Sequence, residues 1–237
     1  MRLLPFVLVS ALPLAAAAAP QRFSSDTHRT HLLELYSSEG CSSCPPAESW
    51  LGGLREAPGL WRNFVPVAFH VVYWDNLGWP DRFARKDFTA RQYAYASAWH
   101  SESVYTPGFV LDGAEWRTAF GRSAPPASSD AAGVLVVDYA EDGTCRVQYA
   151  ANGDYEIHVA LLGGGIVTDV RAGENEGHTL HHEFVALALK EGRLEGGKAE
   201  LSLARPDDRN IPHRALAAWV TRRGELTPLQ ATGGWLN

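Results

Sequence analysis

Residues 32–51 read LLELYSSEGCSSCPPAESWL, an apolar stretch typical of a strand, then a turn with the CSSC motif at 41–44, then a helical stretch. Proline is tolerated in the first turn of a helix but not in its interior, so the prolines at 45–46 place the helix start next to the motif. Cysteines three apart at a helix start lie close enough for a disulfide, and the free N–H groups and the helix dipole favour the thiolate of Cys41. We expect Cys41 to be the more exposed sulfur and Cys44 the buried one.

Three kinds of chemistry fit this cysteine pair. We favour a redox-active pair, and the alternatives are a static disulfide and half of a zinc or copper site. A structural zinc site needs four ligands, and the sequence has no second C-x-x-C motif. A soft-metal site made of Cys41, Cys44 and a distant histidine such as His70 remains open, although a histidine at a strand end is more often bonded to neighbouring polar groups.

A second motif is VYTPGFVLDG at 104–113, in which a proline stands at the entry of a strand that ends in an Asp-Gly turn. Proline fits the first position of a strand, and a cis bond there makes a tight approach. Together with the upstream C-x-x-C motif, this pattern resembles the thioredoxin fold, in which a cis-proline loop faces the cysteines and presents its backbone to the substrate. The resemblance implies that Thr106 and Pro107 lie beside Cys41.

The pattern of elements changes along the chain. Before residue 123, strand-like and helix-like stretches alternate, which predicts an α/β layer with strands at 31–36, 63–73 and 108–112 and helices at 45–56 and 86–100. After it come short β-type stretches separated by glycines, at 134–139, 145–149, 155–162, 183–189, 199–203 and 216–221. Turn signals at 142–143 and 152–153 predict hairpins between the first three of these.

The segment SAPPASSDAAG at 123–133 has the composition of a linker and separates the two patterns. The predicted fold class is therefore α/β: a thioredoxin-like domain at 20–124, a linker at 125–132, and a small antiparallel β-sandwich-like domain at 133–237.

The first nineteen residues, MRLLPFVLVSALPLAAAAA, read as a cleaved signal peptide: one cation, an apolar run, and small residues of the A-x-A type. A membrane anchor is the alternative, but the run falls short of the roughly 20 residues that a spanning helix needs, and prolines interrupt it. We expect a periplasmic or secreted protein that does not contact the membrane after cleavage.

The charge balance argues against nucleic acid as a partner. The chain has 21 Lys and Arg against 27 Asp and Glu. Loss of Arg2 with the leader leaves 20 cations, hence a net charge of −7, whereas nucleic-acid surfaces are basic. Of the three cysteines, Cys145 stands alone on a predicted hairpin and is expected to be a free, packed thiol.

A long aromatic and acidic loop follows the strand at 63–73. We predict that it forms a substrate-binding wall near Cys41, and the alternative is packing over the sheet edge; the candidate residues are Tyr73, Trp74, Asp75 and Trp79. Glu34 is a minor candidate for a proton acceptor of Cys44, but its register directs its side chain to the other face of the strand.

The chain resembles the DUF1223 family of secreted thioredoxin-like proteins. Four stretches carry the resemblance: LELYSSEGCSSCPPAE at 33–48, AFHVVYWDNLGWPDRF at 68–83 followed by FTARQYAYA at 88–96, VYTPGFVLDG at 104–113, and VRAGENEGHTLHHEFV at 170–185. In the second stretch this chain has Val72 where the family pattern has an acid, which puts any role of that acid in doubt here.

The last stretch holds a histidine cluster, with the ligand types His178, His181, His182, Glu183 and Glu174. Their spacing suits a metal only on a helix, and the glycines at 173 and 177 argue for a loop that runs into a strand. We therefore expect structural or exposed polar roles and no metal. In the family pattern, the GEN at 173–175 and His182 match, which suggests a fixed loop packed against the first domain.

We expect thiol–disulfide exchange on protein thiols or disulfides, through a mixed disulfide at Cys41 that Cys44 resolves, with no cofactor. The alternatives are a binding protein for copper or another soft metal and a catalytically silent thioredoxin-like binding module. The direction of exchange and the oligomeric state do not follow from the sequence.

Overall fold

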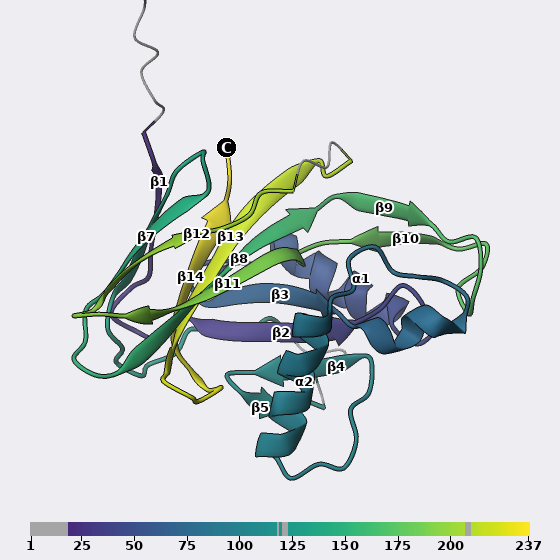
Figure 1. Ribbon diagram of the computed structural model, residues 1–237, viewed down its shortest axis with the longest axis horizontal. Helices are drawn as coiled ribbons and strands as arrows, with labels where there is room; N and C mark the ends of the chain where they lie inside the picture. The colour runs from purple at the N-terminus through teal and green to yellow at the C-terminus, as the bar shows by residue number, and fades with distance from the viewer. Residues whose placement is uncertain (1–18, 118, 120–122, 207–209) are drawn as a thin grey trace, which may run out of the picture.

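The computed structural model describes residues 19–117, 119, 123–206 and 210–237. It is a mixed α/β structure made mostly of strands (Figure 1). Residues 1–18, which hold nearly all of the predicted signal peptide, lie outside the described residues. Among the described helices none is long and apolar enough to cross a membrane.

The first half contains the predicted alternation of strands and helices. The strand predicted at 63–73 ends earlier, at His70, and a 3-10 turn follows it. The elements are β2 (His31–Ser37), α1 (Pro45–Gly53), the 3-10 turn η1 (Leu54–Glu56), β3 (Phe64–His70), the 3-10 turn η2 (Val72–Leu77), α2 (Lys86–Ala98), β4 (Gly108–Leu111) and β5 (Ala114–Glu115).

The remaining strands lie at the N-terminus and in the second half. They are β1 (Gln21–Ser24), β6 (Leu135–Tyr139), β7 (Thr144–Tyr149), β8 (Tyr155–Gly164), β9 (Ile166–Asp169), β10 (Thr179–His182), β11 (Val185–Leu194), β12 (Lys198–Ser202), β13 (His213–Arg222) and β14 (Pro228–Trp235). The described strands form an eight-stranded mixed sheet, β14-β13-β8-β11-β3-β2-β4-β5, a four-stranded antiparallel sheet, β1-β6-β7-β12, and the β9–β10 hairpin.

The eight-stranded sheet takes strands from both sides of the predicted linker. Strand β11 lies parallel to β3, with Val185 opposite Ala68, and the Ala68 amide donates to the Phe184 carbonyl at 2.8 Å. Strand β1 of the first half pairs with β6 of the second. The division into two domains at 125–132 stays a prediction, and the two halves share one continuous sheet.

Two apolar cores lie on opposite sides of strand β13 in the large sheet. Side chains alternate between faces along a strand, and β13 follows this rule. Ala215, Ala217 and Trp219 join the core that contains α1 and α2, whereas Leu216, Ala218 and Val220 join the core beneath the four-stranded sheet. In the second half, the four-stranded sheet packs on the large sheet. In the first half, the helices α1 and α2 pack on the large sheet.

One of the two predicted hairpins is wrong. Strands β6 and β7 pair through the turn at 142–143, as expected. Strand β7 does not pair with β8, because β7 lies between β6 and β12 whereas β8 lies between β11 and β13 in the other sheet. The turn at 152–153 therefore carries the chain from one sheet to the other, which local turn chemistry cannot distinguish from a hairpin.

The helices lie on opposite faces of β2. Ser37, at the end of the strand, donates to Glu48 of α1. Glu34, three residues earlier and therefore on the other face, pairs with Arg91 of α2 at 2.7 Å. The contact between Ser37 and Glu48 places the start of α1, and with it the cysteine motif, at the end of β2.

Candidate functional site

The cysteine pair stands where the sequence placed it. Cys41 and Cys44 form a disulfide with a Cα–Cα distance of 5.4 Å, and Cys44 is the N-cap of α1. The Cys41 sulfur lies 3.4 Å from the Ser43 hydroxyl, and both serines of the motif are exposed. The expected difference in exposure between the sulfurs is wrong, because Cys41 and Cys44 both have 0% exposure.

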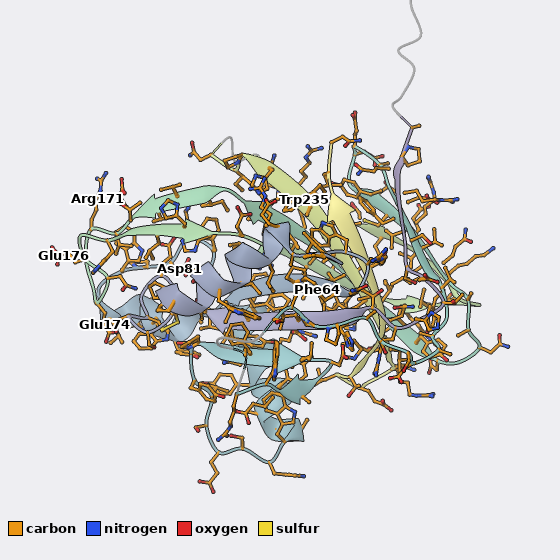
Figure 2. The ribbon with its side chains drawn as sticks, turned by 180° about the vertical axis from the view of Figure 1, so that it is seen from behind. Phe64, Asp81, Arg171, Glu174, Glu176 and Trp235 are labelled. Atoms are coloured by element: carbon orange, nitrogen blue, oxygen red, sulfur yellow. A yellow bond between two sulfur atoms is a disulfide. The ribbon has the colours of Figure 1, made fainter. Side chains whose placement is uncertain are left out.

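The loop that joins β9 to β10 contacts the backbone of the motif at Cys41 and Ser42, and its acidic tip is labelled at Glu174 and Glu176 in Figure 2. The Asn175 side-chain amide donates to the carbonyls of Glu39 and Cys41 at 2.9 and 3.0 Å. The Glu174 carboxylate accepts from the Ser42 hydroxyl at 2.7 Å and from its amide at 3.1 Å. The expectation that this loop packs against the first half is confirmed.

The loop itself has the expected form. Gly173 and Gly177 have φ of +79° and +81°, which side chains other than glycine rarely adopt, and the chain then enters β10. Strand β10 contacts α1, and Figure 1 shows the hairpin extending from the large sheet along that helix.

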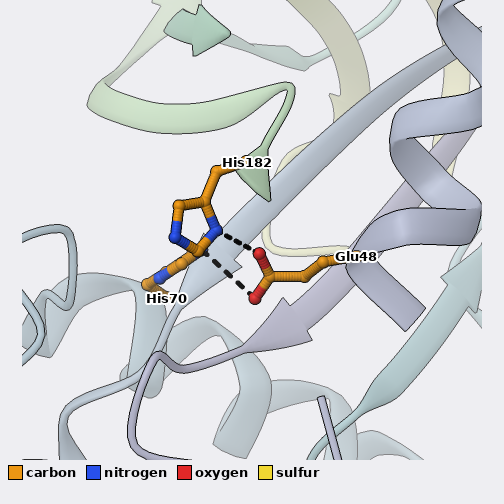
Figure 3. Close-up of side chains that lie close together, drawn as sticks. All are labelled: Glu48, His70 and His182. Carbon is orange, nitrogen blue, oxygen red and sulfur yellow. Dashed lines mark hydrogen bonds and ion pairs between the residues drawn. The ribbon is translucent and has the colours of Figure 1, made fainter. Parts of the chain in front are cut away.

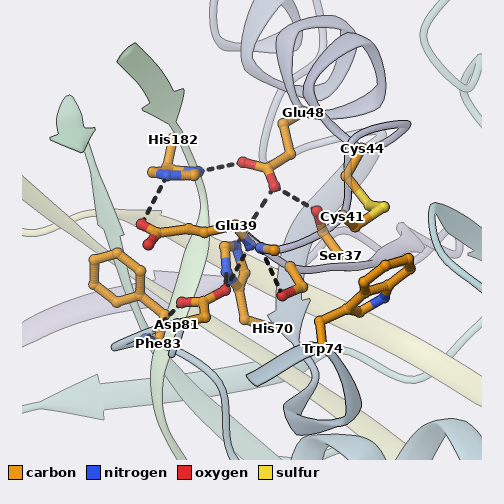
Figure 4. A network of polar contacts seen from close by, with 12 residues as sticks. Ser37, Glu39, Cys41, Cys44, Glu48, His70, Trp74, Asp81, Phe83 and His182 are labelled. Carbon is orange, nitrogen blue, oxygen red and sulfur yellow. Dashed lines mark hydrogen bonds and ion pairs between the residues drawn. A yellow bond between two sulfur atoms is a disulfide. The ribbon is translucent and has the colours of Figure 1, made fainter. Parts of the chain in front are cut away.

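The Thr106–Pro107 peptide bond is cis, as predicted, and lies beside the motif. The Ser43 hydroxyl donates to the Thr106 carbonyl at 3.5 Å, and the Trp74 indole donates to the Thr106 hydroxyl at 2.8 Å. A Cβ at Gly40 would lie 3.0 Å from that of Trp74, so the chain before Cys41 lies close against this tryptophan. Trp74 therefore borders the disulfide (Figure 4).

The other three residues of the predicted substrate wall are half-buried, and each has a hydrogen-bond partner within the protein. Tyr73 donates to Gln92 of α2 at 3.2 Å, Asp75 accepts from the backbone amide of Asp81 at 3.1 Å, and Trp79 donates to Glu39 at 2.7 Å. Burial raises the pKa of Tyr73 to about 12 and also raises the pKa of Asp75. A substrate role for this loop stays a prediction, and Trp74 is the member that lies next to Thr106.

Glu34 lies on the α2 face and not with the cysteines, as its register predicted. Its carboxylate accepts from Arg91 at 2.7 Å, from Tyr95 at 2.6 Å and from Tyr36 at 3.0 Å, in a fully buried cluster. Burial would lower the pKa of Arg91, but the Glu34 charge outweighs it and raises the pKa well above its usual range. The cluster anchors α2 to β2.

A second buried polar cluster lies on the α1 side of the sheet (Figure 4). His182 of β10 contacts Glu48 of α1 through Nδ1, and its Nε2 lies 3.2 Å from Glu39. His70, at the end of β3, contacts Asp81 at 2.6 Å through Nδ1. Since the Glu48 carboxylate also accepts from Ser37, the cluster reaches from the end of β2 to β10.

Four charged groups of this cluster, Glu48, His70, Asp81 and His182, have shifted pKa values. Burial would raise the pKa of Glu48 and of Asp81, but the histidines lower both, Asp81 to about 2. Burial would lower the pKa of the histidines, but the carboxylates raise both, His182 to about 10. The arrangement therefore favours the ionised forms of Glu48 and Asp81, each of which contacts a histidine.

Sequence reasoning missed most of this cluster. His178 and His181 are exposed, as expected, and Glu183 pairs with Arg55 and His213, whereas His182 is buried. The other members of the cluster come from two earlier stretches quoted above for the family resemblance, 33–48 and 68–83. The alternative soft-metal set of Cys41, Cys44 and His70 stays untested: in this structure the two sulfurs bond to each other and His70 contacts Asp81.

The family described as "Protein of unknown function (DUF1223)" matches residues 32–221. No curated protein matches the chain. Protein AtR35 from Agrobacterium tumefaciens, a crystal structure, is similar with a TM-score of 0.60 and 24% identity over 89% of this chain and 95% of that one. HBP35 of Porphyromonas gingivalis is similar with a TM-score of 0.54 and 13% identity over 90% of this chain and 76% of that one. At these identities the two structures show a shared fold alone.

Proposed function

The chain belongs to the DUF1223 family, whose function is unknown, and we propose that it is a thiol–disulfide oxidoreductase of the periplasm or the secreted fraction. The observation that carries the proposal is the Cys41–Cys44 disulfide at the start of α1, next to the cis Thr106–Pro107 bond. The order of β2, motif, α1, β3, α2 and cis-proline before β4 resembles that of thioredoxin. Protein thiols or disulfides would be its substrates.

The exchange needs no cofactor. In the reduced protein, the Cys41 thiolate attacks a substrate disulfide, forms a mixed disulfide and releases one substrate thiolate. The Cys44 thiolate then attacks the Cys41 sulfur, which re-forms the Cys41–Cys44 bond and releases the second substrate thiolate. The protein dithiol is oxidised and the substrate disulfide is reduced, and the reverse sequence oxidises a substrate dithiol. The Ser43 hydroxyl and the start of α1 support the thiolate at Cys41.

Access to Cys41 is part of the proposal. Both sulfurs are buried, so a substrate reaches Cys41 only when the loop around Asn175 moves away. In this proposal Thr106 and Trp74, which lie beside the motif, receive the substrate backbone.

The test is a comparison of two trapping variants in a Cys145→Ala background, so that the third thiol does not contribute. Cys44→Ala leaves the attacking thiolate of Cys41 but removes the thiol that resolves the mixed disulfide. Mixed disulfides with partners should therefore accumulate and appear on a non-reducing gel. Cys41→Ala should trap few, because the exchange assigns the attack on the substrate to Cys41, whereas Cys44, the N-cap of α1, attacks only the Cys41 sulfur. Equal trapping by both variants, or none by either, would contradict exchange and favour a static disulfide in a binding module.

A further inference from the structure

Three side chains from three elements meet beside the disulfide without including it. Glu48 comes from α1, His70 from the end of β3 and His182 from the end of β10. One ligand atom of each lies within 4.8 Å of the others, and all three residues are buried (Figure 3). Imidazole nitrogen and carboxylate oxygen are ligands of first-row divalent metals, and two histidines with one glutamate form a known zinc ligand set.

One of these nitrogens is buried without a hydrogen bond. His70 has 0% exposure, and its Nε2 has no hydrogen-bond partner among the described residues. The same Nε2 points toward Glu48 and lies 3.9 Å from its Oε1. A buried polar atom normally has a partner, so an unpaired nitrogen aimed at a carboxylate leaves a position for an ion between them.

The opposite nitrogen of each histidine already faces a carboxylate. His70 Nδ1 contacts Asp81 at 2.6 Å, and His182 Nε2 lies 3.2 Å from Glu39. Histidines that bind metals almost always donate their other N–H to such a group, which fixes the ring and the tautomer. Asp81 therefore holds the His70 ring by a hydrogen bond, whereas Glu39 lies at ion-pair distance from His182 Nε2 without a hydrogen bond between them.

These outer carboxylates are themselves held in place. Asp81 accepts the backbone amides of Glu39 at 2.8 Å and Phe83 at 2.9 Å. Glu39 accepts the indole N–H of Trp79 at 2.7 Å. The orientation of both rings is thus set by backbone and side-chain contacts and not by the third carboxylate alone.

We propose that His70 Nε2, His182 Nδ1 and the Glu48 carboxylate bind one divalent cation, with Zn²⁺ the best match to this donor set. The ion would enter between Glu48 and the two rings and replace the direct contact of Glu48 with His182. Zn²⁺ would displace one proton from each imidazole, because a histidine that binds a metal must be neutral, and its two positive charges would then offset two of the three buried carboxylates. The sulfurs take no part, because they are bonded to each other.

Such an ion joins α1, β3 and the β9–β10 hairpin at one point. It would hold in place the hairpin whose loop covers Cys41. The inference does not depend on the proposed exchange activity, since it concerns a different set of residues and is tested by binding alone.

The experiment uses chelator-treated, fully oxidised protein, so that no thiol of the pair is available. Titration with Zn²⁺ by calorimetry should give one site per chain. X-ray absorption at one equivalent should show nitrogen and oxygen neighbours with the signature of two imidazoles and no sulfur. This measurement on the unaltered protein decides the question even if variants fold poorly. No saturable site, or sulfur in the first shell, would overturn the proposal.

Substitutions identify the ligands. His182→Gln and Glu48→Gln should each weaken Zn²⁺ binding by more than about 100-fold, since even outer-shell changes cost roughly 10- to 100-fold. The matched control is His181→Gln, because His181 is exposed on the other face of β10 and should leave the affinity unchanged. Equal affinity in the ligand variants and the control would assign the ion to a surface site and refute the inference.

Discussion

The covering of Cys41 can be measured by removing the side chain that fastens it. Asn175 is 4% exposed, and its amide group donates to the carbonyls of Glu39 and Cys41 at 2.9 and 3.0 Å. Asn175→Ala removes both hydrogen bonds and leaves the backbone of the loop unchanged. If the loop must open before Cys41 can react, this variant should open more often.

The size of the effect follows from the two bonds. Each intramolecular hydrogen bond contributes about 0.5–1.5 kcal/mol net, so the closed loop should lose about 1–3 kcal/mol. Because 1.4 kcal/mol is a factor of ten in an equilibrium constant, the open fraction should rise roughly 5- to 140-fold. When opening and closing are fast relative to reaction, the rate of attack on the disulfide rises by the same factor.

The assay is the rate at which excess dithiothreitol reduces the disulfide, followed by quenching with an alkylating reagent and mass measurement. The matched control is Glu176→Ala in the same loop, whose side chain is exposed and should not alter the rate. Urea unfolding of each variant separates loop opening from global unfolding. Equal rates in Asn175→Ala and the unaltered protein would refute the loop as a cover, as would a rate increase no larger than the global loss of stability explains.

The remaining predictions concern the parts of the molecule around the site. Arg91→Leu should cost about 3–5 kcal/mol in urea unfolding, because it leaves the Glu34 carboxylate buried and unpaired; a loss below about 1 kcal/mol would show that the ion pair is not needed. Burial raises the pKa of the Cys145 thiol to about 12, so alkylation at pH 8 should be far slower in the native protein than in guanidinium, and equal rates would contradict its burial. Trp79→Phe removes the donor to Glu39 and should weaken Zn²⁺ binding by about 10-fold; an unchanged affinity would show that Glu39 does not orient the site.

Local features could be predicted because their causes are local. The prolines at 45–46 fix the start of α1, and the three-residue spacing of Cys41 and Cys44 permits the disulfide. The proline at the entry of β4 fixed the place of the cis bond, and the glycines at 173 and 177 indicated a loop before β10. Each of these depends on residues within a few positions of one another.

The wrong predictions concern features that depend on contacts between segments far apart in the sequence. Helix-start chemistry predicted an exposed Cys41, but Cys41 is buried, and its backbone carbonyl accepts a hydrogen bond from Asn175, more than a hundred residues later in the chain. The turn at 152–153 resembles that of a hairpin, yet β8 pairs with β11 and β13 because the large sheet runs through both halves. Neither outcome has a signal within the segment concerned.

The buried cluster of Glu48, His70 and His182 could not be predicted from the sequence for the same reason. Glu48 reads as an ordinary polar residue of a helix, and His182 as one of several histidines before a strand. Their roles appear only when β10 crosses α1 and brings His182 against Glu48, while β3 supplies His70 from the middle of the sheet. Burial of three carboxylates is unfavourable unless cations or hydrogen bonds compensate them, so these residues constrain one another strongly. The β9–β10 hairpin contacts the motif through Asn175 in its loop and Glu48 through His182 at its other end. A substitution at one of these contacts should therefore also weaken the other.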